Sequence, residues 1–106
     1  MNQQVTGTHQ TDEYGNPAGG TTVSVGIQIQ WQNGPLGRGS DRKEPNGAFV
    51  EGVINASLNR LYFYQDSKFK CRENALAITK LEEALHWLNH RTAERENRQV
   101  EGTHSA

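Results

Sequence analysis

The chain has 106 residues, of which 33% are hydrophobic and 22% charged, and its net charge is −1 at neutral pH. A domain this small has a shallow core, so we expect oligomerisation to complete it. The charge argues against a protein that binds DNA or RNA polymers through many phosphates. A single cysteine, Cys71, excludes an intramolecular disulfide, and we expect it to be a buried apolar side chain.

The first 22 residues form a polar segment. Residues 1–22 are rich in Gln, Thr, Gly and Asn, which predicts a flexible N-terminal arm. The arm has neither the basic nor the apolar region of a signal peptide, and the sequence contains no apolar stretch long enough to span a membrane. We therefore expect a cytoplasmic protein with no membrane contact.

Polar and apolar residues alternate after this arm. The alternation predicts one half-buried strand from Val23 to Gln32. Its apolar residues would share one face: Val23, Val25, Ile27, Ile29 and Trp31. Because a lone strand leaves its edges unpaired, it needs a partner from the arm, the next loop or another chain. Residues 33–47 combine glycines, prolines and basic residues and are expected to form a loop.

Two helices are predicted next. Apolar residues recur every three or four positions from Phe49 to Tyr62, with Asn46 as the expected N-cap. A short polar connection leads to a second helix, from about Lys70 to Glu96. Its expected apolar stripe consists of Cys71, Ala75, Ile78, Leu81, Leu85 and Leu88, reinforced by Leu76, Ala77, Ala84 and Trp87. So short a connection makes the two helices antiparallel.

The predicted fold class is therefore α+β. An N-terminal β-strand or hairpin packs on a long antiparallel two-helix hairpin, and oligomerisation completes the core. The single domain covers residues 23–96, and residues 97–106, where the period is lost, form a C-terminal tail.

Few residues have the spacing that a phosphate-binding, metal or catalytic site requires. The segment from Gly34 to Ser40 is favoured as a flexible loop over a phosphate cradle, because its spacing does not match a P-loop. Glu83 and His86, with His90 one turn later, are favoured as a solvated helix face over a metal site. No nucleophile or carboxylate pair suggests catalysis, so we expect no catalytic residues, metal or cofactor. Arg91, Arg95 and Arg98 share a helix face, where exposed ion pairs with neighbouring glutamates are the simplest interpretation.

Part of the second helix resembles a known family. The segments from Cys71 to Asn89, from Arg91 to Glu96 and from Val100 to His104 resemble the helical hairpin of phage anti-defence sponge proteins, which counter the Thoeris and CBASS immune systems of bacteria. The loop from Trp31 to Pro35 and the added strand are similar to the Thoeris anti-defence type.

This resemblance implies sequestration of immune signals in the host bacterial cytoplasm. Such proteins bind cyclic ADP-ribose isomers, and some also bind cyclic di- or trinucleotides, without cleaving them. The family forms homo-oligomers, dimers and often hexamers, with pockets between chains. The implied ligand-binding residues are Tyr64, Asn74, Arg91 and Arg95. Trp31 is a further candidate, as a wall of the ligand pocket.

Three points stay open at this stage. Phe63 and Phe69 lie close to Tyr64 in the sequence, and any of the three aromatics could stack on the base. A second pocket for cyclic oligonucleotides would use Arg42, Lys68 and Lys70. The alternative functions are a helical-hairpin interaction or assembly factor with no small-molecule ligand, and an enzyme that degrades a cyclic nucleotide.

Overall fold

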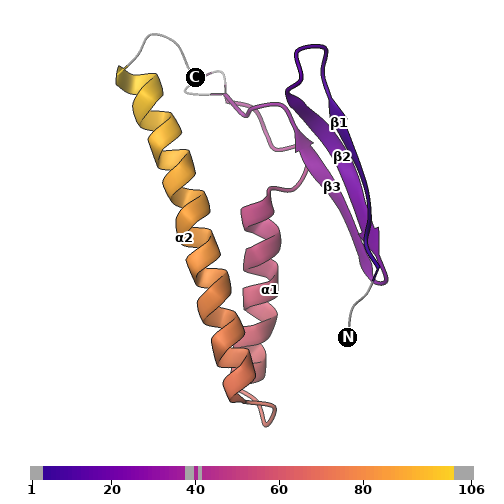
Figure 1. Ribbon diagram of the computed structural model, residues 1–106, viewed down its shortest axis with the longest axis vertical. Coiled ribbons are helices and arrows are strands. Elements are labelled where there is room, and N and C mark those ends of the chain that lie inside the picture. The colour runs from indigo at the N-terminus through magenta and orange to yellow at the C-terminus, as the bar shows by residue number, and fades with distance from the viewer. Residues whose placement is uncertain (1–3, 38–39, 41, 102–106) are drawn as a thin grey trace. The chain divides into compact units, whose positions relative to one another are not determined.

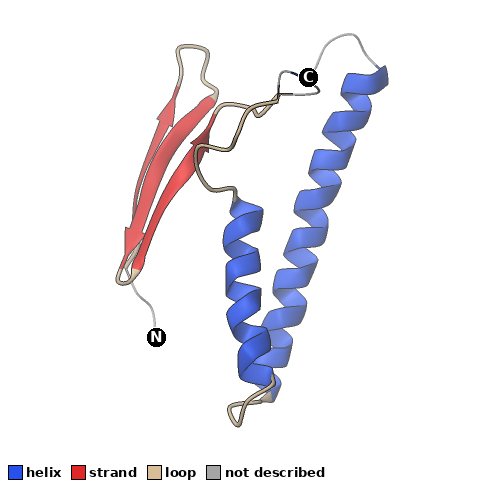
Figure 2. Cartoon of the chain, turned by 180° about the vertical axis from the view of Figure 1, so that it is seen from behind, coloured by secondary structure: helices blue, strands red, loops and turns tan. Residues whose placement is uncertain are grey.

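The computed structural model describes residues 4–37, 40 and 42–101, with side chains described as far as Glu94. Three strands precede two helices: β1 (Thr6–Thr11), β2 (Pro17–Ser24), β3 (Ile27–Asn33), α1 (Val50–Gln65) and α2 (Arg72–Glu101), as Figures 1 and 2 show. The predicted α+β class is confirmed. The chain divides into a sheet unit that ends at Val50 and a helical unit that begins at Glu51.

The sheet is antiparallel in the order β1-β2-β3. β2 and β3 are joined by a two-residue turn, Val25 and Gly26, between the paired residues Ser24 and Ile27. Gly26 has φ of +75°, the conformation that the third residue of a type II turn requires. Glycine adopts this φ without steric cost, so the turn is encoded locally.

The prediction of one strand from Val23 to Gln32 was therefore wrong. The segment contains the end of β2, a turn and β3, and the described part of the expected irregular arm contains β1 and most of β2. β1 and β2 consist largely of threonine, glycine and other polar residues, and few apolar side chains alternate in them. The pairing of β2 with β1 on one side and β3 on the other supplies the order that their own hydrophobicity does not predict.

The predicted apolar face is also divided. Val23 pairs with Gln28 across the sheet, whereas Ile29 pairs with Thr22. Paired residues point to the same side of a sheet and neighbours along a strand point to opposite sides, so Val23 shares a face with Gln28 and not with Ile29. The turn at Val25 reverses the chain, which breaks the alternation that the sequence displays.

An aspartate organises the turn between β1 and β2. The Asp12 carboxylate accepts hydrogen bonds from the backbone N–H groups of Tyr14 at 2.8 Å and Asn16 at 2.9 Å. These bonds stabilise the ionised form, and the bond from Asn16 contributes most to lowering the pKa of Asp12 below its usual value. Gly15, with φ of +82°, closes the turn.

The segment after β3 folds back onto that strand. Asn46 accepts a hydrogen bond from the Asn33 N–H at 2.8 Å and donates one to the Asn33 carbonyl at 3.0 Å. Ala48 forms a parallel bridge with Trp31. Asn46 is therefore not the N-cap of the first helix, as expected, because its side chain binds the end of β3 and α1 begins only at Val50.

α1 and α2 run antiparallel, joined by residues 66–71. The Gln65 amide donates to the Cys71 carbonyl at 3.1 Å and accepts from the Cys71 N–H at 3.1 Å, which closes the connection. Cys71 is exposed, so the expectation of a buried thiol was wrong. It stands at the N-terminus of α2, where its sulfur accepts the Asn74 N–H at 3.4 Å.

The core of the helical unit is small. Leu58 on α1, 3% exposed, is the one buried hydrophobic residue among the side chains that the structure describes. Three residues expected to reinforce the α2 stripe lie outside it, since Ala77 is exposed, Leu76 is 46% exposed and Trp87 is 68% exposed. The expected stripe was too wide because α1 covers one face of α2, the face that bears the half-buried residues Ile78, Leu81, Leu85 and Leu88.

α2 is longer than predicted. It extends to Glu101, so the expected tail from residue 97 continues the helix, and residues 102–106 lie outside the described part of the chain. The segment from Arg91 to Glu101 is rich in Glu, Arg and Gln, which favour a helix even without apolar periodicity. Within the described residues, neither helix has the length and hydrophobicity that a membrane crossing requires.

Candidate functional site

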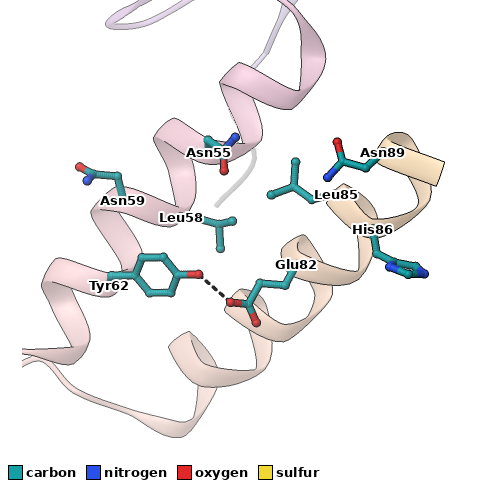
Figure 3. Close-up of a pocket in the computed structure, with 8 residues that line it drawn as sticks. All are labelled: Asn55, Leu58, Asn59, Tyr62, Glu82, Leu85, His86 and Asn89. Atoms are coloured by element: carbon teal, nitrogen blue, oxygen red, sulfur yellow. Dashed lines mark hydrogen bonds between the residues drawn. The ribbon is translucent and has the colours of Figure 1, made fainter. Parts of the chain in front are cut away.

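A polar groove lies between the two helices. It encloses about 460 Å³ and is lined by Asn55, Leu58, Asn59, Tyr62, Glu82, Leu85, His86 and Asn89. Figure 3 shows Leu58 and Tyr62 from α1 pointing toward Glu82 and Leu85 from α2. The groove combines a small apolar base with amide groups that both donate and accept hydrogen bonds.

One hydrogen bond crosses this groove. The Tyr62 hydroxyl donates to the Glu82 carboxylate at 2.6 Å, as the dashed line in Figure 3 marks. This bond holds the proton on the phenol and raises the pKa of Tyr62 above its usual value of 10.0. The pair joins the last turn of α1 to the first half of α2.

Tyr64 lies at the end of α1, beside the connection to α2. Its hydroxyl accepts a hydrogen bond from Nε of Arg60 at 3.2 Å. Its carbonyl accepts one from the Ser67 hydroxyl at 2.6 Å. Tyr64 is half-buried, whereas its neighbours Phe63 and Phe69 are 56% and 66% exposed.

Asn74 is half-buried in the first turn of α2, at the same end of the hairpin as Tyr64. Its side-chain amide donates to the carbonyl of Phe69 at 3.4 Å. The bond is long, so it holds the amide only loosely and leaves its oxygen available to a ligand. The connection thus gathers an aromatic ring and an amide at one end of the helical unit.

Arg91 belongs to the other end of the hairpin. Its guanidinium lies 3.7 Å from the carboxylate of Glu51, in the first turn of α1. Asn74 and Arg91 are separated by about 25 Å along α2, at about 1.5 Å of rise per residue. The helix includes Arg95, whose side chain lies outside the described residues. One chain therefore does not bring Arg91 to Tyr64 and Asn74.

Trp31 is in the sheet unit. It is half-buried on β3, and its indole N–H donates to the Thr22 hydroxyl at 2.7 Å. It contributes to a second polar pocket of about 360 Å³, formed mainly by β-strand residues: Thr8, Gln10, Ala18, Gly19, Gly20, Thr21, Gln30, Trp31, Asn33 and Asn46.

The three basic residues of the expected second pocket are all exposed. Arg42 belongs to the sheet unit, and Lys68 and Lys70 belong to the connection between α1 and α2. The Lys68 ammonium lies 5.9 Å from the centre of the Phe69 ring. Lys68 and Lys70 are thus at the Tyr64 end of the hairpin, where their positive charge adds to that of Arg60.

Sequence reasoning missed two features of the site. Arg60 contacts Tyr64 one helical turn later, a spacing visible in the sequence. The pairing of Tyr62 with Glu82 depends on the register of the two helices, which no local pattern specifies. Among the described residues, no three His, Cys, Asp or Glu side chains are grouped to hold a metal ion.

The sequence of this chain is similar to those of known proteins. Residues 24–93 match the family described as "Acb2/Tad1, hairpin domain", from the end of β2 through most of α2. The chain belongs to the Acb2/Tad1 hairpin family. It is also 64% identical over 76 residues to a protein named "Thoeris anti-defense 1" from Bacillus phage SBSphiJ7. That alignment covers 72% of this chain and 51% of the relative, so the chain spans about half the relative's length.

Membership in the Acb2/Tad1 hairpin family agrees with the resemblance found in the sequence. The match includes Trp31, Tyr64, Asn74 and Arg91 but ends before Arg95. It covers parts of both units, including all of β3 and α1 and most of α2.

Proposed function

We propose that this protein is a phage anti-defence protein of the host bacterial cytoplasm, which binds a cyclic nucleotide immune signal and sequesters it without cleaving it. The observation that carries the proposal is the 64% identity to a Thoeris anti-defence protein. The favoured ligands are cyclic ADP-ribose isomers, and cyclic di- or trinucleotides are a second class.

The ligand site is formed from two chains. Tyr64 and Asn74 lie at the connected end of the hairpin and Arg91 at the other end, about 25 Å away along α2. A nucleotide of ordinary size does not extend over that distance. Arg91 and Arg95 of one copy therefore bind the ligand together with Tyr64 and Asn74 of another.

The residue types suit such a ligand. Arginine donates two parallel hydrogen bonds to a phosphate, which supports Arg91 and Arg95 as ligands of a pyrophosphate. An aromatic ring that stacks on a base contributes about 1–3 kcal/mol. We assign this role to Tyr64 over Phe63 and Phe69, because its hydroxyl and carbonyl are both held by hydrogen bonds. Asn74 fixes the orientation of the base or ribose through its amide.

The small core supports assembly into homo-oligomers, dimers or hexamers. Leu58 is the one buried hydrophobic residue among the described side chains, whereas Phe63, Phe69 and Trp87 are each more than half exposed. Burial of apolar surface contributes about 25 cal/mol per Å², so large exposed aromatic rings favour association. Association also forms the two-chain site.

The proposal is tested by titration calorimetry of the purified protein with cyclic ADP-ribose isomers and cyclic oligonucleotides. The bound ligand is then released by heating and identified by mass spectrometry. We expect a nanomolar dissociation constant, which corresponds to a binding free energy of about −12 kcal/mol. A sequestering protein needs this affinity because it must compete with the effector's receptor for the same ligand. The released ligand should be unchanged.

Two variants test the role of Arg91 in binding: Arg91→Gln, and Lys80→Gln as its matched control. Lys80 is an exposed cation on α2 that pairs with Glu83 at 3.7 Å, so its loss should leave ligand affinity unchanged. Arg91→Gln should weaken binding at least about tenfold. Cleaved ligand would indicate an enzyme. No binding by a folded, oligomeric protein would leave the interaction or assembly factor as the better interpretation.

A further inference from the structure

Arg60 lies against two aromatic rings at the Tyr64 end of α1. The guanidinium carbon of Arg60 lies 5.0 Å from the centre of the Phe63 ring and 5.0 Å from that of Tyr64. The two ring centres are 6.0 Å apart, and their planes are inclined by 52°. The guanidinium therefore lies against two rings at once, which restricts a side chain that is otherwise flexible.

The orientation of Arg60 is restricted further by a hydrogen bond. Nε of Arg60 donates to the Tyr64 hydroxyl at 3.2 Å, so the Nε edge of the guanidinium faces Tyr64. The other edge carries the two Nη groups, which together match the spacing of two phosphate oxygens. Among the described residues, Arg60 has no carboxylate partner, in contrast to Arg91 and Lys80.

Charge at this end of the hairpin also favours an anion. Lys68 and Lys70 follow within ten residues of Arg60, and Arg72 begins α2. These four cations outnumber the two acidic residues of the same segment, Asp66 in the connection and Glu73 in the first turn of α2. Of these cations, Arg60 is the one that contacts Tyr64.

We propose that Arg60 is an anion-binding residue of the half-site that contains Tyr64. Phe63 and Tyr64 hold its guanidinium, and the Nη edge binds a phosphate group of the nucleotide whose base stacks on Tyr64. This inference rests on the proposed function and extends it, because it places a phosphate ligand on the same chain as the stacking ring. Arg91 and Arg95 of the other chain then bind the remaining phosphate oxygens.

The experiment measures the dissociation constant of the cyclic ADP-ribose isomer that the unmodified protein binds most tightly. The variants are Arg60→Gln, Arg60→Lys and Arg72→Gln. Arg72 is the matched control, because it has the same charge at the same end of the hairpin but no aromatic contact among the described residues. Circular dichroism and the urea midpoint of each variant show that it is folded.

We expect Arg60→Gln to weaken binding by about 10- to 100-fold, as the loss of a charge-assisted pair of hydrogen bonds does. Arg60→Lys should give an intermediate affinity, since lysine retains the charge but not the two-donor edge. Arg72→Gln should change the affinity by about threefold or less, the effect of one screened charge.

Three results would overturn the inference about Arg60 and leave the proposed function intact. These are an unchanged affinity of Arg60→Gln, an equal loss for Arg60→Gln and Arg72→Gln, and full affinity of Arg60→Lys. If the unmodified protein binds neither a cyclic ADP-ribose isomer nor a cyclic oligonucleotide, the proposed function fails and the inference fails with it. The two failures are therefore distinguished by the unmodified protein.

Discussion

The guanidinium of Arg91 and the carboxylate of Glu51 lie 3.7 Å apart, between α2 and the first turn of α1. Arg91 is 54% exposed and Glu51 25% exposed at their side chains, so water screens the pair. A pair of this kind contributes about 0–1 kcal/mol to stability. It therefore holds Arg91 only weakly, and under the proposed function a phosphate of the ligand would replace the carboxylate.

Glu51→Gln should increase the affinity for a cyclic ADP-ribose isomer several-fold. The substitution removes a negative charge that competes with the ligand's phosphates for Arg91, and the gain should decrease as salt is added. Titration calorimetry at low and high salt measures the effect. Glu83→Gln, which removes the partner of Lys80, is the control. Equal effects of the two substitutions would show that only net charge matters.

Tyr62→Phe should lower the urea midpoint of unfolding, because the hydrogen bond to Glu82 is lost. The pKa of Tyr62 is raised in the folded state from 10.0, so the contribution of this bond is fully present below pH 10 and is lost as the pH rises through the folded-state pKa. The difference in midpoint between the unmodified protein and Tyr62→Phe should therefore shrink as the pH rises above 10 and disappear once the pH exceeds the raised pKa of Tyr62. A difference that persists unchanged at high pH would contradict this assignment.

Leu58→Ala should destabilise the protein by about 2–5 kcal/mol, the usual cost of a cavity at a buried leucine. Leu58 is 3% exposed at the base of the groove between α1 and α2. Leu76→Ala removes the same atoms from a residue that is 46% exposed, and it should cost less than about 1 kcal/mol. Urea unfolding of the two variants gives the comparison. Similar losses at the two positions would mean that assembly buries Leu76 as completely as Leu58.

Gly20→Ala and Gly52→Ala should have opposite effects on stability. A Cβ on Gly20 would lie 2.2 Å from the Thr8 carbonyl oxygen, at a φ of +142° that other residues rarely adopt. Gly52 lies in α1 with open space around the added carbon, so alanine there should stabilise the helix by about 0.5–1 kcal/mol. Thermal unfolding distinguishes the two. A tolerated alanine at Gly20 would mean that β1 moves away from β2 without loss of stability.

The helices could be predicted because their apolar residues are spaced to form one face each. The α1 core residue Leu58 and the α2 residues Ile78, Leu81, Leu85 and Leu88 all follow that spacing. The strands could not be predicted in the same way. β1 and β2 are mostly threonine, glycine and other polar residues, and their order comes from hydrogen bonds to a neighbouring strand.

The sequence supplied candidate residues for the site, but it did not supply their contacts. Tyr64, Asn74 and Arg91 were expected from a resemblance, and the structure places the first two at one end of the hairpin and the third at the other. The contacts of Arg60 with Phe63 and Tyr64 were not anticipated. A helical spacing makes such contacts available without selecting which of them form.

The sequence by itself determined the two helices and the family, because these depend on residue types at short spacing. Only the tertiary structure decided that Val23 and Ile29 lie on opposite faces of the sheet, that Cys71 is exposed and that Tyr62 binds Glu82. The reason is physical: these relationships depend on strand register and helix register. Register is set by pairing between segments distant in the sequence, which local periodicity does not encode.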